Sequence, residues 1–110
     1  MNKYNARRTV VDGITFASKG EAERYKQLKL LEYGGRISDL VLQPKFVIQE
    51  PFIDGCGIRH RGITYRADFQ YVDRGNLVVE DFKGQQTEVF KLKMKLFLYR
   101  YRNVVFRITK

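Results

Sequence analysis

The middle of the chain carries two adjacent segments in which apolar and polar residues alternate with the two-residue period of a β-strand. In the first, Tyr65 to Tyr71, aromatic residues and an alanine fall on one side, and Asp68 lies among the polar residues on the other. The second, Leu77 to Lys83, follows the turn-forming stretch 73–76. We expect two neighbouring strands, the first of them continuous and buried on one face.

The remaining pattern predicts a hairpin, two helices and further strands. Asp12-Gly13 suits a type I′ turn, and Ser18 with Glu21 three residues later is typical of a helix start. The expected elements are a hairpin of residues 9–11 and 14–16, a helix from Ser18 to about Tyr33, an extended segment and a strand between Ile37 and Gln49 interrupted by Pro44, an exposed loop from Pro51 to Gly62, a helix from Thr87 to about Arg102, and a last strand from Val104 to Ile108. This order (hairpin, helix, three strands, helix, strand) indicates one domain over residues 1–110 of the α/β class, an α+β mixed sheet flanked by helices.

The composition favours a polyanionic partner. The 110 residues include 21 Lys and Arg against 12 Asp and Glu, which gives a net charge of +9 at pH 7. Nucleic acid is therefore the leading candidate, and a membrane surface is a distant second. No apolar run is long enough to span a bilayer and residues 1–8 lack the apolar region of a signal peptide, so we expect a cytoplasmic protein. The lone Cys56, with only His60 nearby, is insufficient for a disulfide or a zinc site.

Strand alternation brings an acid and a base together near the end of the second segment. Asp81 and Lys83 share one face, whereas Glu80 and Phe82 point to the other, although a bulge would reverse the choice between the two acids. With Asp68 on the neighbouring strand, two carboxylates and one ammonium would share a small site. Carboxylate oxygens are ligands for a hard divalent cation, and a cation held there can activate a water molecule. The alternative is that Asp68 is a solvated acid paired with a neighbouring base.

Asp68 followed by Asp81-x-Lys83 resembles the PD-(D/E)xK nuclease signature, with Ala67 in the position of its proline. A longer resemblance runs from about Val10 to the C-terminus and is carried by four segments. These are Phe16–Tyr25, Leu42–Phe46, Tyr65–Tyr71 and Val79–Gly84. In that order they look like a family of small phage and prophage proteins that are regarded as PD-(D/E)xK endonucleases. The resemblance implies a restriction-endonuclease-like core, a bacterial host, and work in phage recombination, replication or DNA packaging.

The resemblance also implies a ligand set for Mg²⁺ or Mn²⁺. Asp68 and Asp81 would bind the metal ion together with the backbone carbonyl of Phe82, and an acid of the first helix would complete the site. Glu21 fits this role, because a helical projection places it on the stripe that should pack on the sheet. Its alternative role is to cap the helix only. Lys83 would assist the attack of water, either as a base or as an electrostatic clamp on the phosphate.

Several basic residues are candidates for contacts with DNA. Lys91 and Lys95 share one stripe of the second expected helix, and Lys91 opens this helix close to the second strand. Apolar residues fill two arcs between the basic stripes, so we expect this helix to be buried on two sides. Arg59 and Arg61 in the expected loop would contact phosphates without reading sequence, and Arg66 lies on the polar face of the first strand. The alternative for each is a solvated surface cation.

The function that these residues predict is a metal-dependent DNA endonuclease, which hydrolyses phosphodiester bonds by in-line attack of water without a covalent enzyme intermediate. One chain has one cutting centre, so cleavage of both strands calls for a homodimer or for two encounters. Relatives of the fold that resolve junctions suggest a preference for branched DNA. The alternative function is a basic nucleic-acid-binding or assembly protein without turnover. An RNA-directed enzyme on the same scaffold is a third hypothesis.

Overall fold

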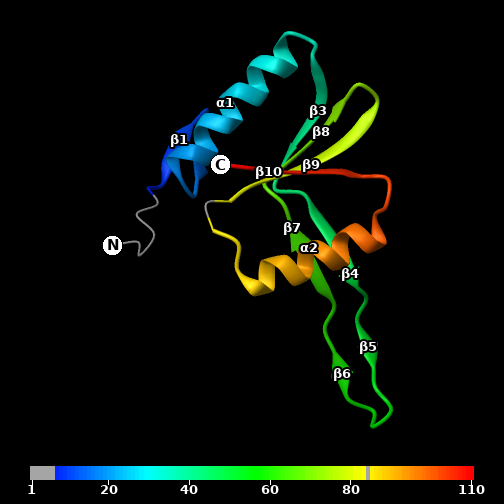
Figure 1. Ribbon diagram of the computed structural model, residues 1–110. Helices are drawn as coiled ribbons and strands as arrows, with labels where there is room; N and C mark the ends of the chain where they lie inside the picture. Colours follow the sequence, from blue (N-terminus) through cyan, green and yellow to red (C-terminus); the bar gives the residue numbers. More distant parts are fainter. Residues whose placement is uncertain (1–6, 84) are drawn as a thin grey trace.

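The structure is a computed structural model that describes residues 7–83 and 85–110 (Figure 1). Its elements, in chain order, are β1 (Thr9–Val11), β2 (Ile14–Phe16), α1 (Lys19–Tyr33), β3 (Ile37–Leu42), β4 (Lys45–Gln49), β5 (Phe52–Ile53), β6 (Arg59–His60), β7 (Ile63–Arg66), β8 (Phe69–Asp73), β9 (Asn76–Phe82), α2 (Glu88–Arg100) and β10 (Val105–Thr109). Residues 1–6, part of the N-terminal stretch without the apolar region of a signal peptide, lie outside the described residues. So does Gly84, the last residue of the segment Val79–Gly84. Neither α1 nor α2 is long and apolar enough to cross a membrane.

A four-stranded mixed sheet in the order β10-β9-β8-β3 forms the centre of the fold. β8 lies antiparallel to both β3 and β9. The turn between β8 and β9 has positive φ at Arg74 and Gly75, as expected for a tight hairpin turn. β10 lies parallel to β9, so the chain has to cross over between them, and α2 forms this crossover. The predicted mixed sheet with two helices is confirmed.

The two helices cover opposite faces of this sheet with two separate hydrophobic clusters. Val78 of β9 belongs to the cluster under α1, and the adjacent Val79 belongs to the cluster under α2. The α1 cluster consists of Phe16, Ala22, Tyr25, Leu28, Ile37, Phe69, Tyr71 and Val78. The α2 cluster consists of Ile48, Tyr65, Ala67, Val79 and Phe97. Burial of these side chains on both faces stabilises the sheet that carries the acidic residues.

The N-terminal hairpin and α1 form where the sequence predicts them. Asp12 and Gly13 both have positive φ in the turn between β1 and β2. The Ser18 hydroxyl accepts a hydrogen bond from the Glu21 amide at 3.1 Å and so caps the start of α1. Gly35, with φ of +79°, follows the end of the helix in a conformation that glycine adopts without strain.

The strand predicted over residues 65–71 is not continuous. It breaks at Ala67 and Asp68 into β7, which pairs with β4, and β8, which pairs with β3 and β9. The segment that pairs with β7 and β8 breaks at the same level, between β4 and β3. There Gln43 has φ of +51° and Pro44 offers no amide to a ladder. Hydrogen bonds from Ala67 N to Pro44 O and from Gln43 N to Asp68 O tie the two breaks together.

This break also corrects the prediction that the alternating aromatic residues share one buried face. Tyr65 and Ala67 pack in the α2 cluster, whereas Phe69 and Tyr71 pack in the α1 cluster. All four are buried, so the period-two pattern identified the buried positions correctly. It could not identify the two different cores, because the chain changes direction at Asp68.

Beyond the break, residues 45–66 form a two-stranded arm that extends from the rest of the molecule (Figure 1). Its inner part is the β4–β7 ladder and its outer part is the β5–β6 ladder. The prediction of a loop between Pro51 and Gly62 is therefore wrong for β5 and β6, which pair with each other. The segment is exposed, as expected. Asp54 closes the tip, because its Oδ1 accepts hydrogen bonds from the amides of Cys56 and Ile58.

α2 begins at the predicted cap, where the Thr87 hydroxyl accepts from the Phe90 amide at 3.1 Å. It ends at Arg100, two residues earlier than expected, because Tyr101 leaves helical backbone geometry. Only one side of α2 packs against the protein, with Phe97 fully buried. The predicted burial on two sides is wrong for the single chain, since apolar residues on the other side are exposed. They are Val89, Leu92, Leu96 and Tyr99.

Candidate active site

β9 presents two neighbouring acids to opposite faces of the sheet. Glu80 and Asp81 are both completely buried. Arg24 of α1 binds Glu80, whereas Tyr65 of the α2 cluster donates a hydrogen bond to Asp81. The register between β8 and β9 runs without a shift, so the predicted alternation of the acids is confirmed.

Asp68 and Asp81 are held together by hydrogen bonds with the backbone. The Asp68 amide donates to Asp81 Oδ1 at 3.1 Å, and the Phe82 amide donates to Asp68 Oδ2 at 2.7 Å. The Tyr65 hydroxyl donates to Oδ2 of Asp81. Asp68 can make these contacts because it lies in the break between β7 and β8. The structure thus brings together the two aspartates that the sequence placed on neighbouring segments.

Glu21 reaches the same region from the first turn of α1. Its backbone amide makes the capping bond to Ser18, and the residue is only 7% exposed. Burial raises the pKa of Glu21, the positive charge of Lys83 opposes this rise, and the charge of Asp81 adds to it. Glu21 therefore lies within electrostatic reach of both residues. The capping bond to Ser18 comes from its amide, and the charge of its carboxylate acts on Asp68 and Asp81.

Lys83 directly follows the last residue of β9. Its amide donates to Thr109 O at 2.9 Å, which fixes the end of β9 against β10. Its ammonium lies 5.0 Å from the centre of the Phe90 ring in the first turn of α2, within the range of a cation–π contact. The lysine is half-buried, so its charge acts with limited screening on the nearby acids.

Asp68 carries the largest electrostatic perturbation among the acids of the site. Burial and then the negative charges of Glu21 and Asp81 raise the pKa of Asp68 to about 7, although the hydrogen bond from the Phe82 amide opposes the rise. An acid with a pKa near neutrality, in contact with another buried acid, is typical of functional sites. A cation bound beside it would compensate the negative charge that burial and the neighbouring acids make unfavourable.

The donor chemistry of these residues fits Mg²⁺ or Mn²⁺, because carboxylate oxygens are the ligands that such hard cations prefer. Among residues 7–83 and 85–110, however, no group of three or more His, Cys, Asp or Glu side chains is arranged to hold a metal ion. Both oxygens of Asp81 also accept hydrogen bonds, from the Tyr65 hydroxyl and from the Asp68 amide. A cation would have to compete with these donors.

A second polar network lies on the opposite face of β9, and the sequence did not reveal it. Arg24 binds Glu80 in a bidentate manner, with Nε–Oε2 at 2.6 Å and Nη2–Oε1 at 2.8 Å, and the Tyr71 hydroxyl donates to Oε1 at 2.6 Å. Burial alone would raise the pKa of Glu80, but the hydrogen bonds from Arg24 and Tyr71 and the Arg24 charge outweigh it and lower the pKa. Strand alternation placed Glu80 on the face opposite Asp81, but it did not indicate that α1 and Arg24 cover this face.

The structure separates the candidate DNA contacts into two groups. Lys91 and Lys95 are exposed on α2, and Lys91 directly follows Phe90, over which the ammonium of Lys83 lies. Lys91 also lies 3.6 Å from Glu88, a solvent-exposed ion pair of small energetic value. The arm carries the second group, with Arg66 beside the site and two arginines near the tip. All three are exposed: Arg59, Arg61 and Arg66.

The fold and the site define the class of this protein: an α+β domain with a mixed sheet that holds a buried group of acids beside a lysine. The chain belongs to the family described as "Protein of unknown function (DUF1064)", whose model matches residues 1–110. No curated protein and no solved structure matches it.

Proposed function

We propose that this protein is a metal-dependent DNA endonuclease that hydrolyses phosphodiester bonds on a restriction-endonuclease-like core. One observation supports this function above the others. Glu21, Asp68, Asp81 and Lys83 come from α1, from the β7–β8 break and from the end of β9, and they interact electrostatically in one partly buried site. Burial of mutually repelling carboxylates is unfavourable for folding, so the arrangement needs a chemical use.

In this proposal the residues of the chain divide the work. Asp68, Asp81 and Glu21 supply carboxylate oxygens to a bound Mg²⁺ or Mn²⁺, together with the backbone carbonyl of Phe82. When bound, the metal ion supplies Lewis acidity and lowers the pKa of water. Lys83 faces the scissile phosphate, and its ammonium either stabilises the developing negative charge or exchanges a proton with the attacking water.

The positioning of Asp81 is the task of Tyr65. Its hydroxyl donates to one carboxylate oxygen, and the Asp68 amide donates to the other. Because Tyr65 packs against Phe97 with ring centres 5.0 Å apart, the hydroxyl is fixed by the α2 cluster. The aromatic core therefore sets the orientation of an acid that has to be ready for a ligand.

The test is a cleavage assay on supercoiled, linear duplex, four-way-junction and single-stranded DNA, and on RNA of matched sequence. Each substrate is incubated with Mg²⁺, with Mn²⁺ or with EDTA. We expect cleavage with the metal ions only, and a loss of at least a hundredfold in Asp81→Asn and in Lys83→Ala. Asp39→Asn and Lys26→Ala are matched controls, because both residues are exposed and lie outside the site.

A metal-binding measurement separates a failed site from a failed substrate. Mg²⁺ or Mn²⁺ should raise the melting temperature of the wild type and of Asp39→Asn but not that of Asp81→Asn. If the wild type and Asp81→Asn leave every substrate uncut while both bind DNA, the protein is a non-catalytic nucleic-acid-binding protein. Cleavage of RNA alone would assign the site to RNA. A preference for the junction, together with a dimer in sedimentation, would support the homodimer that cutting of both strands requires.

A further inference from the structure

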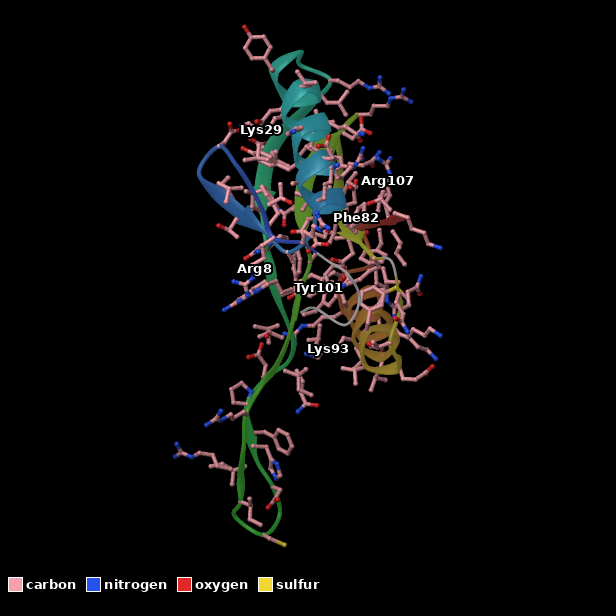
Figure 2. The ribbon with its side chains drawn as sticks, turned by 90° about the vertical axis from the view of Figure 1, so that its left-hand side faces the viewer. Arg8, Lys29, Phe82, Lys93, Tyr101 and Arg107 are labelled. Atoms are coloured by element: carbon pink, nitrogen blue, oxygen red, sulfur yellow. The ribbon has the colours of Figure 1, made fainter. Side chains whose placement is uncertain are left out.

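The arm of residues 45–66 contributes only Tyr65 to the proposed chemistry, yet it is the most extended feature of the molecule. Figure 2 shows it as a narrow two-stranded ribbon that continues beyond the sheet and both helices, with side chains on either face. Its outer section, β5 and β6, is exposed at all four residues. Phe52 and Ile53 are 46% and 62% exposed, so this section does not contribute to either hydrophobic cluster.

The charges of the arm are arranged to leave a positive surface. Its two acids are engaged, since Glu50 pairs with Arg100 at 2.9 Å and Asp54 pairs with His60 at 2.7 Å. By contrast, its Lys and Arg side chains form no ion pair with residues 7–83 or 85–110. These cations are Lys45, Arg59, Arg61 and Arg66. A partner with a regular array of negative charges complements this surface.

We propose that the arm lies in the major groove of a DNA duplex and thereby determines the length of duplex that the protein requires beside the cut. This inference rests on the proposed function. A two-stranded β-ribbon fits the major groove, which is about 12 Å wide. Arg59 and Arg61 then reach phosphates along the groove. The exposed Ile53, which pairs with Arg59 on the same face of the ribbon, contacts apolar base edges such as thymine methyl groups.

The arm sets a length for the contact. Strands rise about 3.3 Å per residue, so the nine steps from Arg59 to Asp68 span at most about 30 Å. Base pairs are about 3.4 Å apart along the axis of a duplex and the groove winds around this axis, so the reach covers at most about nine base pairs. The substrate that the arm selects is therefore a duplex that continues for nearly one helical turn to one side of the candidate active site.

A second copy of the chain is a poorer occupant of this surface, because its arm carries the same positive charge. A protein partner would also leave the unpaired arginines without phosphates to contact. The two occupants give opposite results in the experiment below, which measures binding in EDTA and therefore does not depend on cleavage.

The first measurement uses Cys56, which is exposed and is the single cysteine of the chain, close to the tip of the arm. N-ethylmaleimide is neutral, so DNA does not repel it. We expect a saturating 30-base-pair duplex to slow alkylation of Cys56 at least tenfold, and a single strand of the same length to protect it less. Alkylation at an unchanged rate with the duplex bound would overturn the proposal. Protection that appears on raising the protein concentration without DNA would assign the arm to self-association and overturn it as well.

The second measurement removes charge from the arm. The double variant Arg59→Ser/Arg61→Ser should bind the 30-base-pair duplex about tenfold to a hundredfold more weakly at 100 mM salt, with a salt slope smaller by about 2. Arg36→Ser/Arg74→Asn is the matched control, since both arginines are exposed and belong to the α1–β3 and β8–β9 connections. These connections lie at the end of the molecule opposite the arm (Figure 1). Asparagine tolerates the positive φ of position 74. Equal weakening by the two pairs would refute a specific role of the arm.

Failure of the arm interface can be told apart from failure of the proposed nuclease function. A protein that binds through the arm in EDTA but leaves all substrates uncut with Mg²⁺ keeps this interface and loses the nuclease assignment. A protein that cuts DNA while its arm variants bind like the wild type keeps the nuclease assignment and loses the interface.

Discussion

Replacement of Asp68 by asparagine should make the metal-free protein more stable while it abolishes activity. The folded protein raises the pKa of Asp68 from 3.8 to about 7, chiefly through burial and the charge of Glu21. Each pKa unit corresponds to about 1.4 kcal/mol. The ionised Asp68 therefore lowers the free energy of unfolding by at most about 4 kcal/mol. Asparagine stays neutral, and its side-chain oxygen can still accept the hydrogen bond from the Phe82 amide.

The pH dependence of this gain has a defined sign. A carboxyl group with a raised pKa in the folded state holds a proton that the unfolded chain has already released. Wild-type stability therefore falls as the pH rises from about 4 to about 7, and the full cost is present above that window. We expect Asp68→Asn to stabilise the protein by about 1 kcal/mol at pH 4.5 and by about 2 to 4 kcal/mol at pH 8.

Urea unfolding at pH 4.5 and at pH 8, in EDTA, measures both values. Asp39→Asn is the control, because it removes one negative charge at an exposed position with positive φ that asparagine tolerates. The reasoning fails if the stabilisation is the same at the two pH values, or if Asp68→Asn destabilises the protein at pH 8. Mg²⁺ at pH 8 should raise the stability of the wild type and leave that of Asp68→Asn nearly unchanged.

Three further predictions concern the residues around the site. Arg24→Met leaves the buried Glu80 without its partner and should cost about 3 to 5 kcal/mol in urea unfolding at pH 7; a loss below about 1 kcal/mol would contradict this role. Because the folded state lowers the pKa of Glu80, its contribution is present above the unfolded value near 4.5 and is lost as the pH falls through the folded value, so Glu80→Gln should flatten the acid limb of the stability curve. Gly20→Ala would place a methyl group 2.3 Å from the Phe82 ring, so it should reduce stability by about 1 to 3 kcal/mol, and Phe82→Leu should restore part of the loss only if this contact is the cause.

Local signals predicted most of the secondary structure. Asp12-Gly13, Ser18 and Thr87 marked the hairpin and the helix starts, because turn and cap preferences depend only on neighbouring residues. The arm could not be predicted in the same way. Its outer ladder consists of two residues on each side, and the glycines around it are typical of a loop.

The candidate site could be predicted where it depends on neighbouring residues, and could not where it depends on contacts between distant parts of the chain. The alternation of β9 placed Glu80 and Asp81 on opposite faces, which the structure confirms. The break at Asp68 was not visible, because it arises from hydrogen bonds to Pro44 and to β9, which are distant in the sequence. The role of Arg24 was missed for a related reason, since its partner lies 56 residues away along the chain.

Glu80 and Asp81 show how the surroundings, and not burial, decide which acid is available for chemistry. Both are completely buried on one strand. Glu80 receives a bidentate guanidinium, so its negative charge is already compensated and a metal ion would gain little there. Asp81 receives two neutral donors and lies against Asp68, whose pKa is raised towards neutrality. A cation bound on the Asp81 face would remove a repulsion, whereas one on the Glu80 face would displace Arg24. For this reason we propose Asp81, and not Glu80, as the metal ligand.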